Sequence, residues 1–324
     1  VGMRYFLTGK FPRGLAANGS SMTTAAVGAT GDLGFDLPNL VVGMETYNES
    51  QPAHATGLAI SASTDILALV RPLTDTFSER PATMDAIRAY TKTWDCAGVS
   101  LDGGGLVSAY REGFPAAERL ASGELAEHFD FLAQGGLPAS TIKALQHFGV
   151  TTYNDMATER GQAFLAAQAL TQGIAQTVSI RLASGIDHHD DNWSSDHAPA
   201  LLSGFDALSS LLDFLKTEYP DVWARTIVVA SSEFARTPEI NSRDGRDHHL
   251  SSACILAGAG IKSGTVFGKT DDTYTRTTVD PATGDPGDTL IRPPDLHATI
   301  FEAAGLPWEH LSNQSPVVME GILS

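Results

Sequence analysis

From about residue 155 onward, the chain alternates between helix-like and strand-like segments joined by short connections. Helices are predicted at 163–170 and 201–215, and strands at 177–182, 226–230 and 253–258, because apolar residues recur there with the matching period. Such alternation is typical of a parallel sheet covered by helices. We therefore predict an α/β fold with a mostly parallel central sheet, and an earlier strand at 40–44.

Glycines and polar residues mark where several of these elements begin and end. Gly173 stands where a glycine would end the first helix, and Asp295 and Gly305 are placed to cap and to end a further helix at 295–303. Cys254 lies within a predicted strand, so we expect a small core residue there. The helix at 201–215 has one apolar face, formed by Leu201, Leu202, Phe205, Leu208, Leu211, Leu212 and Leu215.

Size and composition restrict the possible partners. We expect a single domain over all 324 residues, with a helical insertion or lid at 75–150. The net charge of −17, from 38 acidic and 21 basic residues, argues against a nucleic-acid partner, because phosphate backbones require a basic face. No apolar run approaches the roughly 20 residues needed to cross a bilayer.

Two clusters of histidine and aspartate follow predicted strands. The first contains Asp187, His188, His189, Asp190 and Asp191, and the second contains Asp247, His248 and His249. Together they hold four of the ten histidines. Imidazole nitrogen and carboxylate oxygen are ligands for divalent cations, so we predict a metal site that binds zinc, manganese or calcium.

A third group of polar residues comes directly after the strand at 226–230. Functional groups gather at the carboxyl ends of strands in parallel sheets, which brings Glu233 and Arg236 into the same expected site. Arg236 would pair either with an anionic oxygen of a ligand or with a local carboxylate. Asp247 would either bind the metal or orient His248 through its second ring nitrogen.

The motifs around these residues resemble one family in order along the chain. The segment 232–237 (SEFART) resembles its SEFGRT motif, 245–248 (GRDH) its GRDH motif, and 187–189 (DHH) the end of its WDTH segment. The segments 258–271 and 295–300 match two further blocks. The chain resembles the uncharacterised DUF1501 family over about 160–305, and that family is similar to the alkaline phosphatase and sulfatase superfamily.

The resemblance implies a three-layer α/β sandwich like that of alkaline phosphatase and hydrolysis of a small anionic phosphate or sulfate ester. Carried over by motif, the implied metal ligands are Asp187, His189, Glu233 and His248, with Asp247 beside them. Phe234 stands where phosphatases have a second histidine. Family members often have export signals, which implies a periplasmic or extracellular location.

The N-terminal segment adds an expectation about the nucleophile. Residues 6–12 (FLTGKFP) resemble the sulfatase segment LLTGRYP, and in that group the nucleophile lies about nine residues before the Thr, which corresponds to Thr8 here. We therefore expect the nucleophile and a further aspartate ligand upstream of Val1.

Two alternatives use the same residues. Asp187, His188 and His189 also resemble the motif of manganese-dependent DHH phosphoesterases, but the upstream Asp-x-Asp motif of that class is missing from the sequence. The other alternative is a secreted, non-catalytic binding or structural protein on a hydrolase-like fold, which Phe234 and the expected position of the nucleophile favour.

Overall fold

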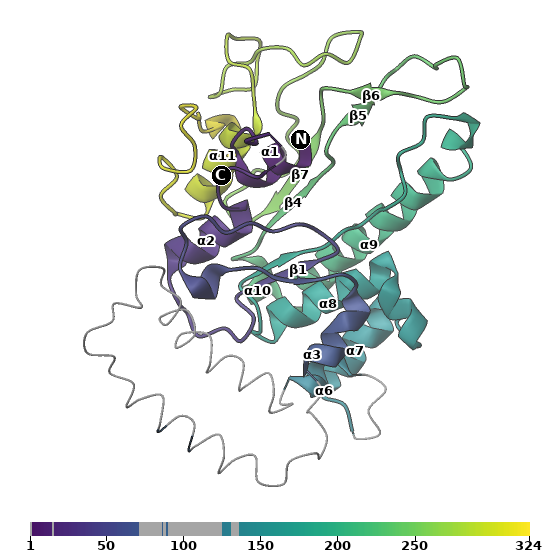
Figure 1. Ribbon diagram of the computed structural model, residues 1–324, viewed down its shortest axis with the longest axis vertical. Helices are drawn as coiled ribbons and strands as arrows, with labels where there is room; N and C mark the ends of the chain where they lie inside the picture. Colours follow the sequence, from purple (N-terminus) through teal and green to yellow (C-terminus); the bar gives the residue numbers. More distant parts are fainter. Residues whose placement is uncertain (1, 15, 71–85, 87–88, 90–124, 131–135) are drawn as a thin grey trace.

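The structure, a computed structural model, describes residues 2–14, 16–70, 86, 89, 125–130 and 136–324 (Figure 1). The expected insertion at 75–150 lies largely outside the described residues. Within its bounds the structure describes helices α6 (Ala126–Phe129) and α7 (Ala139–Phe148). The described part is a mixed α/β structure in which helices surround a small parallel sheet.

The parallel sheet has three strands in the order β2-β1-β3. Strand β1 (Asn39–Val42) lies between β2 (Leu58–Ile60) and β3 (Thr177–Ser179), and pairs in parallel with both. The predicted strands at 40–44 and 177–182 are confirmed, although each is shorter than expected.

Both faces of β1 are covered, because all four of its residues are buried. On one face, Asn39 Nδ2 donates to Thr24 Oγ1 of helix α2 (Met22–Thr30) at 3.0 Å. On the other face, Leu40 and Val42 join the main hydrophobic core with helix α8 (Glu159–Thr171). Helix α8 is a core helix that is apolar over much of its circumference, and Gly173 follows it at a φ of 67°, as expected for a helix end.

Helix α9 (His197–Glu218) packs on α8 with only part of the predicted apolar face. Leu208, Leu211 and Leu215 are buried, as are Ala207 and Phe214, which the predicted face did not include. Leu202 and Phe205 are instead 63% and 51% exposed. Gly204 lies in the buried stripe, where the helix approaches the carbonyl oxygen of Leu182. At about 100° per residue, Leu202 lies nearly opposite Gly204 and Phe205 about a quarter turn away.

By length and composition alone, the segment Asp191–Glu218 could cross a membrane, a criterion that core helices of soluble proteins also meet. In this structure α9 is amphipathic, and its buried face contributes to the main core. Helix α10 (Pro220–Trp223) follows it directly.

The next strands depart from the predicted parallel sheet. Strand β4 (Ile227–Ser231) pairs antiparallel with β7 (Cys254–Gly258), and β5 (Ala235–Arg236) pairs antiparallel with β6 (His248–His249). The chain between β4 and β7 folds back on itself as the β5–β6 hairpin and includes no crossover helix. A parallel partner would require such a crossover.

Cys254 is exposed, which corrects the expectation of a core residue. It begins β7, whose described sheet partner is β4, and the first two residues of β7 are exposed. The other end of the β4–β7 pair is less exposed, because Leu256 packs near Leu296 and Ile300 of helix α11 (Pro293–Ala303).

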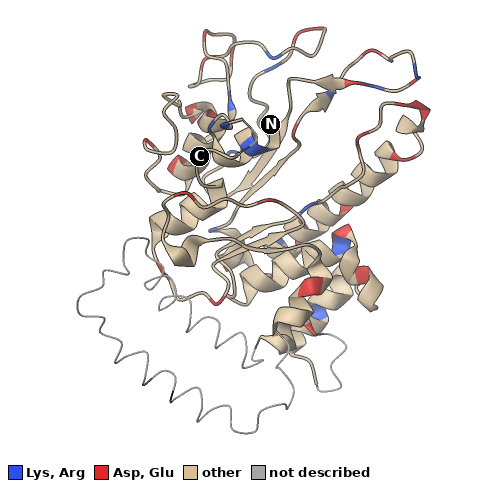
Figure 2. Ribbon diagram, in the orientation of Figure 1, with Lys and Arg blue, Asp and Glu red and all other residues tan. Residues whose placement is uncertain are grey.

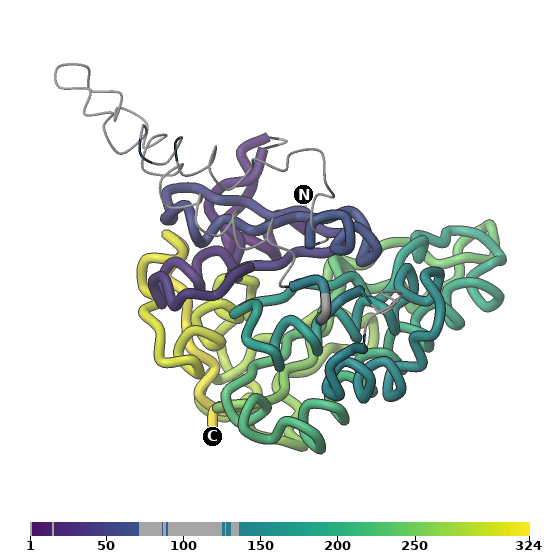
Figure 3. The backbone as a smooth tube through the Cα atoms, turned by 90° about the horizontal axis from the view of Figure 1, so that it is seen from below, coloured from purple at the N-terminus to yellow at the C-terminus, as the bar shows by residue number. Residues whose placement is uncertain are grey.

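A segment near the N-terminal end (purple) and one near the C-terminal end (yellow) adjoin in Figures 1 and 3, although the marked chain ends lie well apart in Figure 3. Helix α1 (Gly2–Thr8) packs against α11, and Nε2 of the buried His297 donates to the carbonyl oxygen of Phe6 at 2.7 Å. Asp295 is not the N-cap of α11 as expected but its third residue, where it accepts from the backbone N–H of the N-cap residue Arg292 at 2.7 Å. Pro293 begins the helix because its fixed φ suits a first helical position. Gly305 follows the end of α11 at a φ of 67°, as predicted.

Short elements complete the described chain. They are α3 (Ile66–Val70) and the 3-10 turns η1 (Ala53–Ala55), η2 (Ser63–Asp65), η3 (Tyr153–Ala157), η4 (Asp191–Trp193) and η5 (Glu320–Ile322).

Candidate metal centre

Three of the predicted ligands meet between the loop that follows β3 and the strand β6. Oδ1 of Asp187 lies 3.1 Å from Nε2 of His189 and 2.7 Å from Nε2 of His248. The two imidazole nitrogens are 3.1 Å apart. The three atoms therefore form a small triangle to which two segments, about 60 residues apart in sequence, contribute.

This triangle fits a divalent ion. At bond lengths of about 2.0–2.1 Å, the ligands of a tetrahedral zinc ion are separated by about 3.3 Å, close to the spacing found here. The side chains of Asp187, His189 and His248 are 67%, 28% and 44% exposed, so solvent reaches the triangle. Three protein ligands leave one tetrahedral position open, as in catalytic rather than structural zinc sites.

Arg236 holds Asp187 in place. Its Nη2 donates to Oδ1 of Asp187 and to the carbonyl oxygen of Ile186, both at 2.8 Å, and its Nη1 donates to the carbonyl oxygen of Arg246 at 3.1 Å. The Arg236 side chain is only 8% exposed. Of the two roles that the sequence left open, the structure shows the salt bridge to a local carboxylate.

These contacts keep the Asp187 carboxylate ionised. The hydrogen bond to His248, followed by the one to Arg236, lowers the pKa of Asp187 well below its usual range. Arg236 lies directly opposite His248 in the β5–β6 pair. The antiparallel pairing therefore places the arginine and a histidine ligand next to the same carboxylate.

Asp247 orients His189 and not His248, which corrects the expected partner. Oδ1 of Asp247 lies 2.8 Å from Nδ1 of His189. Asp247 and His248 both reach the imidazole of His189 but at different ring nitrogens, since Asp247 lies at Nδ1 and His248 lies 3.1 Å from Nε2. Nδ1 is the ring nitrogen closer to a carboxylate, at 2.8 Å from Asp247 against 3.1 Å between Nε2 and Asp187. Nδ1 is therefore the better-placed donor, and Nε2 is the nitrogen that faces the triangle and could bind a metal.

Phe234 contacts the third ligand. Its ring stacks on the imidazole of His248, with the centroids 3.8 Å apart and an angle of 23° between the planes. The guanidinium carbon of Arg236 lies 5.1 Å from the centroid of the same phenyl ring. Phe234 thus packs against His248, a role that the sequence did not predict.

Glu233 lies outside the triangle. Its Oε1 accepts from the backbone N–H of Met3 at 3.0 Å, in the first turn of α1. A carboxylate is favourable there because the first N–H groups of a helix have no partner within the helix. The structure therefore places the predicted ligand Glu233 on the N-terminal helix and does not bring it to Asp187.

Three further members of the two clusters, His188, His249 and Asp190, have other partners. Nδ1 of His188 lies 3.4 Å from Nδ1 of the buried His197. Nδ1 of His249 accepts from the backbone N–H of Ser251, and Asp190 pairs with Arg243 at 3.3 Å. Spacing along the sequence could not separate these residues from the ligands, because all of them belong to the same two short loops.

A family model described as "Protein of unknown function (DUF1501)" matches residues 109–315. The chain belongs to the DUF1501 family. The resemblance of its motifs to this family is thereby confirmed. No curated protein and no solved structure matched the chain.

The region shared with DUF1501 contains the whole candidate centre. Carboxylates outnumber guanidinium groups in the segments 186–191 and 233–248 that form it, which favours a bound cation. Along the described part of the ribbon in Figure 2, Lys and Arg positions are scattered among Asp and Glu positions.

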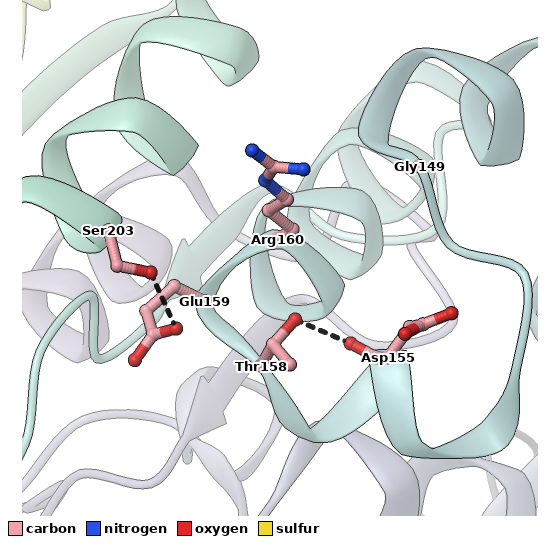
Figure 4. A pocket seen from close by; sticks show the side chains of 6 residues that line it. All are labelled: Gly149, Asp155, Thr158, Glu159, Arg160 and Ser203. Atoms are coloured by element: carbon pink, nitrogen blue, oxygen red, sulfur yellow. Dashed lines mark hydrogen bonds between the residues drawn. The ribbon is translucent and has the colours of Figure 1, made fainter.

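The DUF1501 chain also has a hollow of about 300 Å³ at the start of α8 (Figure 4). Its carboxylates are already hydrogen-bonded within the protein: Asp155 accepts from the backbone N–H groups of Thr151 and Thr152, and Glu159 accepts from Ser203 Oγ. Arg160 points away from both of them. The hollow is lined by none of the triangle residues, so the chemical argument rests on the open triangle and not on this depression.

Proposed function

We propose that this DUF1501 protein binds one divalent metal ion through Asp187, His189 and His248 and hydrolyses phosphate or sulfate esters. The observation that carries the proposal is the solvent-exposed triangle of one carboxylate oxygen and two imidazole nitrogens, with sides of 2.7–3.1 Å. Such a site, with an open position for water or substrate, is typical of hydrolytic metal centres.

The donor set supports zinc or manganese better than calcium. Calcium takes about six to eight oxygen ligands, whereas two of the three donors here are imidazole nitrogens. Imidazole nitrogen is a good ligand for zinc, and a mixed nitrogen and carboxylate site also accepts manganese.

The protein residues around the ion would prepare it for this chemistry. When bound, the metal supplies a Lewis acid and lowers the pKa of a coordinated water. Arg236 keeps Asp187 ionised, Asp247 keeps the Nδ1 proton of His189 on the side away from the metal, and Phe234 holds the ring of His248. Each proposed ligand thus has its own supporting contact.

We also propose a three-layer fold related to alkaline phosphatases and sulfatases, and an exported protein that acts on small anionic esters. The burial of β1 between α2 and α8 and the parallel order of β1, β2 and β3 support this fold. The location rests on the family resemblance alone.

A second candidate function is metal binding without catalysis. Phe234 occupies the place of a superfamily histidine, and Glu233 is bound to the start of α1. These two observations favour a site with fewer ligands than that of the phosphatases of the superfamily, and therefore with a single metal ion. A protein that binds metal but hydrolyses no ester would support this second function.

The test is hydrolysis of aryl phosphate and aryl sulfate esters by the purified natural protein with added zinc or manganese. We expect metal-dependent turnover that Asp187→Ala and His248→Ala each lower by at least about 100-fold, because removal of a ligand opens the triangle. Asp190→Ala is the matched control, since this carboxylate lies in the same loop but pairs with Arg243. Turnover that survives in both ligand variants would contradict the assignment.

A further inference from the structure

Asn241 lies in the loop between β5 and β6 and uses both ends of its amide. Its Nδ2 donates to the carbonyl oxygen of His189 at 3.1 Å and to Oδ1 of Asp247 at 3.0 Å. Its Oδ1 accepts from the backbone N–H groups of Arg243 and Gly245, at 2.9 and 3.1 Å. One side chain therefore closes its own loop and contacts the loop that carries Asp187 and His189.

Asn241 shares an acceptor atom with a proposed ligand. Oδ1 of Asp247 receives hydrogen bonds from Asn241 and from Nδ1 of His189. The amide thus fixes the carboxylate that sets the tautomer and the ring orientation of His189.

The same two loops touch backbone to backbone beside Asn241. A Cβ atom on Gly245 would lie 2.1 Å from the carbonyl carbon of His189 and 2.3 Å from the amide nitrogen of Asp190. Asp190 and Asp244 form an isolated antiparallel bridge at this point. Glycine is required there because the loops approach more closely than any side chain permits. The position of His189 relative to His248 is therefore set by direct loop contact and by Asn241.

We propose that Asn241 is a positioning residue that holds His189 and Asp247 in register with His248. Neither aspartate nor alanine can replace it. Aspartate would keep the acceptor but would direct an oxygen at Asp247 Oδ1 and the His189 carbonyl, both of which only accept hydrogen bonds. Alanine would remove all four hydrogen bonds.

The proposal is tested with Asn241→Asp and Asn241→Ala in the full-length protein. One measurement rests on the proposed metal-binding function: the dissociation constant for zinc, measured by calorimetry. We expect zinc to bind about 10- to 100-fold more weakly to both variants, the effect typical of lost supporting contacts. The control is Asn48→Asp, because Asn48 makes bonds of the same kind, to Gln51 and Thr56, in another loop. That control is expected to bind zinc like the wild type.

The second measurement needs no metal. Nitrogen-15 NMR of histidine-labelled, metal-free protein at pH 7.5 reports which ring nitrogen of His189 carries the proton, with the signal assigned by its loss in His189→Ala. We expect the Nδ1-protonated form in the wild type and in Asn48→Asp. In both Asn241 variants we expect a changed tautomer ratio or a broadened signal, with near-native circular dichroism.

The two measurements separate the two claims. A wild-type protein that binds no zinc or manganese would contradict the proposed function, while the NMR result would still decide the role of Asn241. An unchanged His189 signal in both Asn241 variants would overturn the positioning role. Unchanged zinc affinity in variants of a metal-binding wild type would overturn it as well.

Discussion

At the scale of single residues, the histidines of this chain differ in their exposure to solvent and in their hydrogen-bond partners. His189 and His248 face solvent and share Asp187. His297 is 3% exposed and donates from Nε2 to the carbonyl oxygen of Phe6 at 2.7 Å. Burial lowers the pKa of His297 to about 4, because the charged imidazolium cannot be hydrated there. This residue joins α11 to α1 and is a structural histidine.

The first prediction is that His297 makes stability depend on pH. Its pKa in the folded protein is below the ordinary value of about 6.5, so its contribution is complete above pH 6.5 and is lost as the pH falls towards 4. The loss amounts to roughly 3 kcal/mol, which urea unfolding at several pH values would measure.

His297→Gln is the matched variant, since a glutamine amide can still donate to the Phe6 carbonyl oxygen. Its stability should change less than that of the wild type between pH 6.5 and 4. An identical pH dependence in both proteins would show that other groups cause the acid sensitivity.

Residue types in the sequence were sufficient to select Asp187, His189 and His248, which the structure brings together, but not to predict the directions of all the side chains. Glu233 follows a strand as the ligands do, yet its carboxylate turns to the first turn of α1. The contact of Phe234 with His248 had no visible signal, because a phenylalanine beside polar residues is more often a core residue. Such directions depend on segments that are distant in sequence.

At the scale of elements, helix α9 shows how packing selects part of an apolar pattern. Phe214 is fully buried, and its ring lies 5.3 Å from that of Phe148 and 5.4 Å from that of Tyr219. Phe205, on the same helix, is 51% exposed. Both positions have helical backbone, so a comparison of the two isolates the contribution of burial.

The second prediction concerns these two phenylalanines. Phe214→Ala should lower the free energy of unfolding by about 3–5 kcal/mol, because it removes buried surface and leaves a cavity. Phe205→Ala should change it by about 0.5 kcal/mol or less, as is usual for exposed positions. Chemical denaturation of both variants measures the difference; equal effects would contradict the described packing of α9.

The positions of helices and strands along the chain could be predicted from local sequence patterns, whereas the pairing of the strands could not. Gly173 and Gly305 end helices α8 and α11 as predicted, since a left-handed residue interrupts a helix wherever it occurs. The antiparallel pairing of β4 with β7 was not predicted, because the apolar runs of both strands fit either direction. The β5–β6 hairpin between them decides the direction, and its two-residue strands are too short to be recognised from sequence.

At the scale of the whole molecule, the candidate centre joins two parts of the fold. Asp187 and His189 follow β3, whose residues pack against the main core formed by α8 and α9. His248 belongs to the β5–β6 hairpin, which is inserted between β4 and β7, and these strands pack on α11. A metal ion bound by all three residues would link the two parts, and would therefore stabilise the folded chain.

The third prediction follows from this link. Zinc at 100 times its dissociation constant should raise the free energy of unfolding by about 2.7 kcal/mol, since the unfolded chain does not hold the three ligands together. Thermal unfolding with and without zinc would show the shift. In Asp187→Ala the shift should be largely lost, whereas Asp190→Ala should retain it; a similar shift in all three proteins would point to binding elsewhere.

The most direct test of the account is the metal content of the purified protein after dialysis against zinc or manganese, measured by elemental mass spectrometry. We predict one ion per chain in the wild type and almost none in Asp187→Ala or His248→Ala. A wild type without bound metal, or an ion retained by both variants, would contradict the assignment of Asp187, His189 and His248 as a metal centre.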